Sequence, residues 1–235
     1  MAFAIDWDQT GEKFYETGTD RGVLYPKNAS GAYGPGVAWN GLTAVTENPS
    51  GAEDTKLWAD NQKYLSLYSA EEFGCTIEAY TYPDEWAECD GSKEVVAGTG
   101  VYAGQQARKG FGFCYRSVLG NDELGESYGY KLHVVYGCQA APSEKSYATI
   151  NDSPEAITFS WEVTTTPVNI TKISGMKPTA IFTIDAAKLK AQEGGEAKLT
   201  AIEEALYGTK AAGAAAAVEP RILLPDDIIG ILNGD

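Results

Sequence analysis

The most regular alternation of apolar and polar residues in this chain lies between residues 105 and 138. Residues 111–119 and 132–136 each repeat with the period of two that is typical of a half-buried β-strand. Between them, residues 120–126 are rich in glycine, asparagine and aspartate, which tolerate the backbone of a tight reversal. The pattern therefore predicts one long β-hairpin, and no part of it resembles a catalytic motif.

Shorter strands are predicted on both sides of this hairpin. The same period of two supports strands over residues 37–45, 71–82, 157–164 and 179–184. The first of them is interrupted at Asn40 and Gly41.

After residue 185 the apolar period changes. Leu199, Ile202 and Leu206 recur at the spacing of one helix face, which predicts an amphipathic helix over residues 196–207 with Gly208 as its cap. The narrow apolar stripe suits a helix that packs on one flank of a sheet. We therefore predict a mainly β domain over residues 37–210 with one flanking α-helix.

The first 36 residues are rich in glycine, proline and aromatic residues, with no regular period. So many breakers argue against a helix or a long strand. We expect an extended N-terminal arm over residues 1–36, laid over its own body or a neighbour, and a core that begins near Val37.

Two further stretches interrupt the pattern. Residues 47–70 are expected to form a long polar loop that nevertheless contains Leu57, Trp58 and Tyr64, and loops of this length are usually functional or disordered. Residues 211–235 begin with an alanine-rich linker and continue with the apolar run 222–224, which predicts a C-terminal arm. This arm either extends to a neighbour or folds back onto its own domain.

The charge of the chain excludes one class of function. With 33 acidic and 18 basic residues, the formal net charge is −15. Affinity for nucleic acid comes largely from lysine and arginine that neutralise phosphates, so a protein that grips DNA is not expected. An acidic surface serves solubility or keeps a passing polyanion from sticking.

Membrane and secretory signals are not evident. No apolar run approaches the roughly 18 residues that a membrane span needs, and Asp6 and Asp8 lie where a secretory signal would be apolar. Four cysteines could form disulfides, but without a signal peptide we expect reduced thiols.

Candidate catalytic and metal-binding chemistry is also missing. The single histidine, His133, lies in the middle of a predicted strand without a recognisable nucleophile beside it. The acidic residues of 84–90 lack the alternation and the central glycine of a calcium loop, and a solvated acidic turn is the simpler interpretation. We predict no enzyme activity, no metal and no cofactor.

Seven short segments spread along nearly the whole chain carry a further signal. They are Phe14-Tyr15-Glu16-Thr17-Gly18, Gly22-Val23-Leu24-Tyr25-Pro26, Val37-Ala38-Trp39-Asn40-Gly41-Leu42, Ala59-Asp60-Asn61, Ala79-Tyr80-Thr81-Tyr82-Pro83-Asp84, Gly120-Asn121-Asp122 and Ala205-Leu206-Tyr207-Gly208-Thr209. In this order the chain resembles the major tail (tail tube) proteins of long-tailed, non-contractile bacteriophages.

The resemblance implies a β-sandwich with a flanking helix, closed into hexameric rings around a channel that conducts DNA without specific binding. It also implies that the rings stack into a tube, bridged by the long loop and the terminal arms. The implied location is the virion tail, assembled in the host cytoplasm. The implied partners are further copies of the chain and the tape measure, tail terminator and baseplate proteins; no membrane is involved.

Subunit contacts are expected in three places: the start of the domain, the long loop and the C-terminal run. The residues are Trp39, Asn40, Leu57, Trp58, Asp60, Asn61, Tyr64, Ile222, Leu223 and Leu224. A carbohydrate-binding β-sandwich is the alternative function, because the chain has 14 tyrosines and 5 tryptophans. A glycosidase, with its paired carboxylates, is a third reading.

Overall fold

The computed structural model describes residues 5–150, 152, 155–211 and 216–234. Its centre is the antiparallel pair β11 (Phe111–Asn121) and β12 (Gly125–Ala140), so the predicted hairpin is confirmed. The Asn121 carboxamide oxygen accepts hydrogen bonds from the backbone N–H groups of Glu123 and Leu124, at 3.2 and 2.7 Å. These bonds close the turn, as its asparagine-rich sequence predicts.

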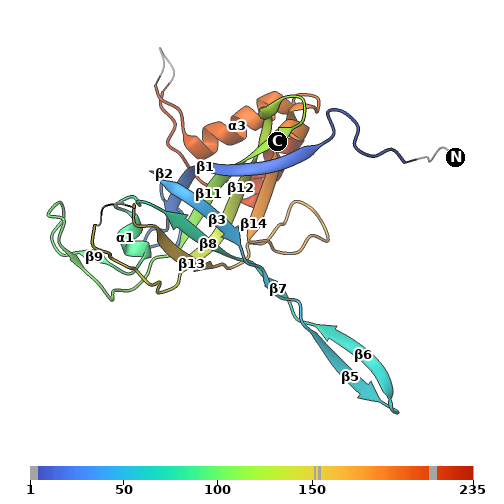
Figure 1. The fold of residues 1–235 in the computed structure, drawn as a ribbon, viewed down its shortest axis with the longest axis horizontal. Coiled ribbons are helices and arrows are strands. Elements are labelled where there is room, and N and C mark those ends of the chain that lie inside the picture. The colour runs from blue at the N-terminus through green and yellow to red at the C-terminus, as the bar shows by residue number, and fades with distance from the viewer. Residues whose placement is uncertain (1–4, 151, 153–154, 212–215, 235) are drawn as a thin grey trace.

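The protein is a mainly β structure of two layers that share β12 (Figure 1). The strand order is β2-β1-β11-β12-β13-β8-β3, with β14 also beside β12, and every pairing is antiparallel. β12 pairs with β14 through Lys131–Val135 and then with β13 through Gln139 and Ala140. The other strands are β1 (Phe14–Pro26), β2 (Val37–Trp39), β3 (Leu42–Glu47), β8 (Gly74–Ala79), β13 (Phe159–Thr164) and β14 (Ile181–Asp185).

One hydrophobic core lies between the two layers. Trp39, Trp86, Trp161 and Phe113 meet there, with ring centroids 4.6 to 5.6 Å apart for the pairs that contact. Trp86 comes from α1 (Trp86–Cys89), a single turn that seals this core. Three of the five tryptophans are therefore interior residues.

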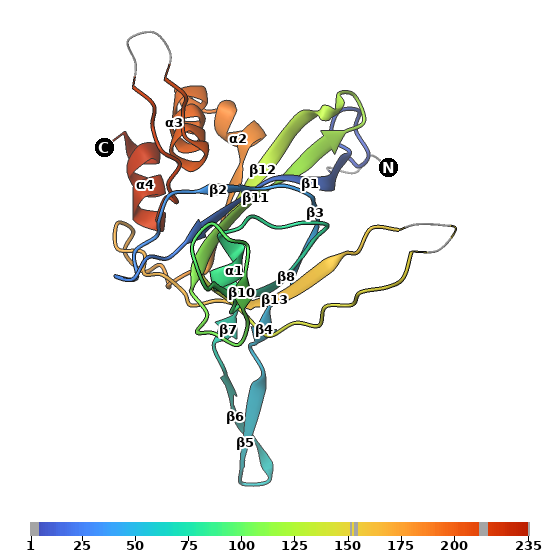
Figure 2. The ribbon, with the colours of Figure 1, turned by 90° about the vertical axis from the view of Figure 1, so that its left-hand side faces the viewer.

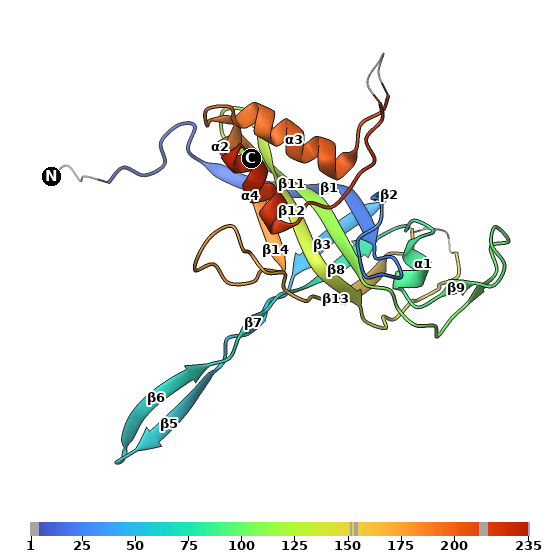
Figure 3. The same cartoon turned by 180° about the vertical axis from the view of Figure 1, so that it is seen from behind.

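A second core lies on the other face of β1, β11, β12 and β14, under three helices (Figure 3). The helices are α2 (Ala186–Lys190), α3 (Gly195–Tyr207) and α4 (Pro225–Asn233). α3 confirms the predicted helix, and Gly208 ends it with φ +72°. Phe113 points into the first core and Cys114 into the second, so β11 is buried on both faces rather than half-buried as predicted.

The prediction that the N-terminal 36 residues contain no long strand is wrong over residues 14–26. β1 is a 13-residue strand that pairs along β11 and places Leu24 and Tyr25 in the two cores. The strand continues through two irregularities, at Gly18, a residue of the expected breaker type, and at Arg21. Their φ angles are +62° and +50°, and the register shifts beside each. Bulges of this kind bend a strand without ending it. Among the described residues of 1–36, residues 5–13 and 27–36 lie outside the sheet strands.

Of the two alternatives stated for the C-terminal segment, the structure shows the second: the segment folds back onto its own domain and does not extend as an arm. Ile222 and Leu223 are buried, and the Tyr136 hydroxyl donates to the Leu223 carbonyl at 2.9 Å. Pro225 begins a helix rather than ending a strand, because the first helical position needs no N–H donor. The predicted alanine linker lies partly outside the described residues.

Candidate interaction surface

The predicted long loop is a β-hairpin that projects from the body (Figures 1 and 2). Its stem pairs β4 (Ser50–Gly51) with β7 (Glu71–Glu72), and its blade pairs β5 (Asp54–Ala59) with β6 (Gln62–Tyr68). At the tip Asp60 and Asn61 have φ +50° and +61°, the backbone of a tight two-residue turn that aspartate and asparagine favour. We call residues 50–72 the projecting hairpin.

The two faces of the projecting hairpin differ in chemistry. Leu57 lies opposite Leu65, and Leu67 follows two residues along, so these three leucines share one face. Their exposed fractions are 40%, 46% and 51%. On the other face Asp54 forms ion pairs with Lys56 and Lys63, at 4.0 and 3.9 Å. We call the first side the leucine face.

The blade stands clear of the body in Figures 1 and 2, and its leucine face is exposed to solvent. Trp58 and Tyr64, near the tip, are also exposed, at 68% and 73%. An isolated two-stranded hairpin is marginally stable in water, and contiguous exposed apolar side chains usually mark a binding surface. The projecting hairpin is therefore the strongest candidate for an interaction element.

The sheet under the helices offers a second kind of surface, namely two open edges. β1 pairs with β2 only through residues 22–24, which leaves residues 14–21 as an edge. At the other side β14 pairs with β12, and no second neighbour is recorded for it among the described residues. Between these edges the strand order is β1-β11-β12-β14. Open edges carry unpaired backbone groups that can accept another strand.

The predicted contact residues fall into two groups. Leu57, Trp58, Asp60, Asn61 and Tyr64 lie together on the projecting hairpin. The rest are scattered over the body: Asn40 and Leu224 are exposed, while Trp39, Ile222 and Leu223 are interior residues, so a surface role for these three is wrong.

The contacts of Trp39 explain why it cannot be a surface contact residue. Its indole N–H donates to the Thr81 carbonyl at 2.9 Å, and its ring packs on Trp86. Sequence reasoning also missed Leu65 and Leu67, whose alternation with polar residues was the available signal. The open edges could not be found without the strand order.

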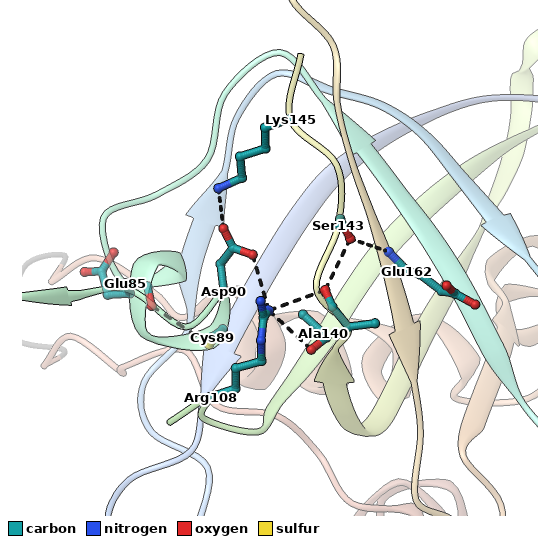
Figure 4. A network of polar contacts seen from close by, with 9 residues as sticks. Glu85, Cys89, Asp90, Arg108, Ala140, Ser143, Lys145 and Glu162 are labelled. Carbon is teal, nitrogen blue, oxygen red and sulfur yellow. Dashed lines mark hydrogen bonds and ion pairs between the residues drawn. The ribbon is translucent and has the colours of Figure 1, made fainter. Parts of the chain in front are cut away.

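The acidic stretch 84–90 is only partly a solvated turn (Figure 4). Asp90 is nearly buried and receives Arg108, at 3.3 Å, and the ammonium group of Lys145. Arg108 also donates to the carbonyls of Ala140 and Ala141, at 3.4 Å. This network ties α1 to the end of β12, which is a structural role.

His133 has a serine beside it that the sequence did not reveal. Ser117 lies across the hairpin, with its hydroxyl oxygen 2.9 Å from His133 Nε2, and Glu47 lies 3.7 Å from Nδ1. The Tyr115 ring stacks on the imidazole at 4.6 Å, and its hydroxyl donates to the same Glu47 oxygen. Burial lowers the pKa of His133, against the opposing effect of Glu47. The contacts satisfy a buried imidazole, and they provide no visible oxyanion site.

The cysteines are unpaired, as predicted, and all four are buried. Burial raises the pKa of Cys75, Cys89 and Cys114 to about 12.

In the part of the chain that the structure describes, no group of three or more histidine, cysteine, aspartate or glutamate residues could hold a metal ion. The helices among those same residues are too short or too polar to cross a membrane.

Comparison with known proteins adds no identification. No family model matches the chain, and no curated protein matches its sequence.

Proposed function

We propose that this protein is the structural subunit of a bacteriophage tail tube, which forms stacked hexameric rings around a channel that conducts DNA during genome ejection. The ordered segments of the sequence support this proposal, as does the β-sandwich with helices on one face. The observation that carries it is the combination of two open edges on one sheet with a projecting hairpin whose apolar face is uncovered.

The open edges are suited to closing a ring. The sheet has four antiparallel strands from edge to edge, β1-β11-β12-β14, so β1 and β14 run in opposite directions. The β14 edge of one copy can therefore pair with the β1 edge of the next. Because each copy contributes an even number of strands, the pairing between copies is antiparallel like the pairings within the sheet, and it repeats from copy to copy. Six copies give 6 × 4 = 24 strands, and closed barrels of about 16–18 strands already leave an aqueous channel.

The charge of the chain fits the passage of DNA. Six copies carry a formal charge of 6 × −15 = −90. Phosphates are repelled by such a surface, so a polyanion slides through without being held.

The projecting hairpin supplies the contact between rings in this proposal. At about 3.3 Å per residue, the strands from Ser50 to Asp60 carry the tip roughly 30 Å beyond the stem. A contact between two different surfaces does not close on itself and generates a filament. The ends of that filament would meet the tape measure, tail terminator and baseplate proteins of a virion tail.

The carbohydrate-binding alternative loses part of its basis. Trp39, Trp86 and Trp161 are interior residues, so they cannot form a sugar-binding platform. The glycosidase reading loses Asp90, which is held by Arg108 and Lys145.

Negative-stain electron microscopy of the purified full chain tests the proposal. We expect rings or tubes with a central channel, and light scattering should give a mass that is a multiple of six subunits. A protein that stays monomeric at high concentration, or binds glycans as a monomer, would contradict it.

A further inference from the structure

A cleft between the first residues of β14 and the loop before it offers exposed apolar side chains and a lysine to the leucine face. The cleft has a volume of about 440 Å³ and is lined by Ile170, Met176, Lys177, Pro178, Ile181 and Phe182. We propose that the leucine face of the projecting hairpin of one copy binds this cleft on a second copy. The inference rests on the proposed function and assigns its stacking contact to particular residues.

The cleft and the loop beside it expose apolar side chains next to polar ones such as Lys177 and Thr179. Met176 is 52% exposed, and Ile173, on the same loop, is 41% exposed. Covering them together with Leu57, Leu65 and Leu67 removes apolar surface from water on both partners, at about 25 cal/mol for each Å². The three leucines, Ile173 and Met176 are all left at least 40% exposed within the single chain.

The charges of the two surfaces are complementary. Residues 47–73 contain six acidic and two basic residues, whereas residues 169–190 contain four lysines and one aspartate. Both lysines of the first segment already pair with Asp54. Glu71 and Glu72 at the hairpin stem and Lys177 in the cleft are exposed, and no ion-pair partner is recorded for them among the described residues. Docking gives these charges partners, which favours the correct register.

The occupant is a second copy because the chain cannot fill its own cleft. The blade points away from the body in Figure 1, and the 90° view of Figure 2 separates it from the loop that precedes β14. Since the hairpin and the cleft are different surfaces, each copy offers one and receives one. Repetition of that contact builds an open stack, which is the geometry that a tube requires.

A charge-exchange experiment on the full chain tests the pairing. One variant is Lys177→Glu, and the other combines Glu71→Lys with Glu72→Lys. Each alone is expected to raise the concentration needed for tube formation at least about tenfold, since like charges now meet. An equimolar mixture should restore tubes, because each variant hairpin then meets a cleft of opposite charge. Lys93→Glu, on β9 (Lys93–Glu94), is the matched control and should assemble like the wild type.

The outcomes separate this inference from the proposed function. If the wild type forms tubes and both charge variants do so at the same concentration, the cleft is not the docking site, although the tube proposal stands. Loss of tubes without recovery in the mixture also overturns the pairing. If the wild type forms neither rings nor tubes, both proposals fail. Thermal unfolding of each variant checks that these exposed substitutions leave the fold intact.

Discussion

The body and the projecting hairpin are made from similar residues but are stabilised in opposite ways. In the body, Trp161 and Trp86 pack ring against ring inside a closed core. On the hairpin, Trp58 and Leu67 have comparable apolar surface and leave it in water. The difference teaches that residue type alone does not say whether an apolar side chain serves folding or association. An apolar side chain serves folding where its strand is covered by a second sheet or by helices, as in the body, and is free for association where its strand has no such cover, as on the hairpin.

The largest effect is expected from removing the C-terminal segment. A chain that ends after residue 211 loses Ile222, Leu223 and Ile228 from the core under the helices. Burial of such side chains contributes about 1.5–3 kcal/mol each, so the loss approaches the whole stability of a typical domain. Circular dichroism should show a chain that is largely unfolded at 37 °C. A truncated protein with an unchanged melting temperature would show that the segment is an independent arm.

Matched tryptophan variants compare the two regions directly. Trp161→Ala should lower the free energy of unfolding by about 3–5 kcal/mol, because it leaves a cavity among packed rings. Trp58→Ala should change it by less than about 0.5 kcal/mol, since the side chain is exposed. Urea denaturation measures both. Equal losses would remove the distinction between core and association surface.

A smaller effect is expected where the C-terminal segment approaches β11. A Cβ atom on Gly112 would lie 2.4 Å from Ile222 Cδ1, so Gly112→Ala must displace that side chain. Overpacking of this kind typically costs about 1–3 kcal/mol. Gly104→Ala, where no atom lies within 4 Å, is the control. The double variant Gly112→Ala with Ile222→Val should recover part of the loss in the same denaturation assay.

The pH dependence due to His133 is expected to be modest. Burial lowers the pKa of His133 in the folded protein, so below pH 6.5 the unfolded chain binds a proton that the folded chain does not. Stability therefore falls as the pH drops from 6.5 toward the folded pKa, by at most about 1.4 kcal/mol per pH unit. Melting curves of the wild type minus those of His133→Gln isolate this contribution. A difference, wild type minus variant, that decreases as the pH rises would have the wrong sign.

The smallest effect on stability belongs to the projecting hairpin. Replacing residues 53–69 with an Asn-Gly turn joins Ala52 to Ala70, whose backbone atoms already lie 3.4 Å apart. Unfolding of the body should be unchanged, while tube formation is lost. A marked drop in the melting temperature would mean that the hairpin supports the body after all.

The sequence predicted elements whose signal is local. The alternation in residues 111–119 and the helical spacing of Leu199, Ile202 and Leu206 both correspond to observed elements. The sequence-based prediction failed where a neighbouring strand, and not the local pattern, determines the structure. The glycines near residues 14–26 predict a broken chain, but β11 pairs with β1 on both sides of the irregularities at Gly18 and Arg21.

The candidate surface was predicted only in part. Proline at position 225 ends a strand or begins a helix with equal ease, so the position of the C-terminal segment could not be derived from its residues. The tip residues of the hairpin were found because Asp60 and Asn61 form part of a recognisable segment. The β14 cleft joins loop and strand residues that lie apart in sequence, and no local pattern indicates it.

The buried thiols have a consequence for the resistance of the molecule to oxidation. With a pKa of about 12, only about one in 10⁵ molecules carries a thiolate at Cys75, Cys89 or Cys114 at pH 7, and only the thiolate reacts readily. Oxidation of these thiols and their exchange with disulfides should therefore be slow in the folded protein. The chain can pass from a reducing to an oxidising medium without a change in its covalent structure.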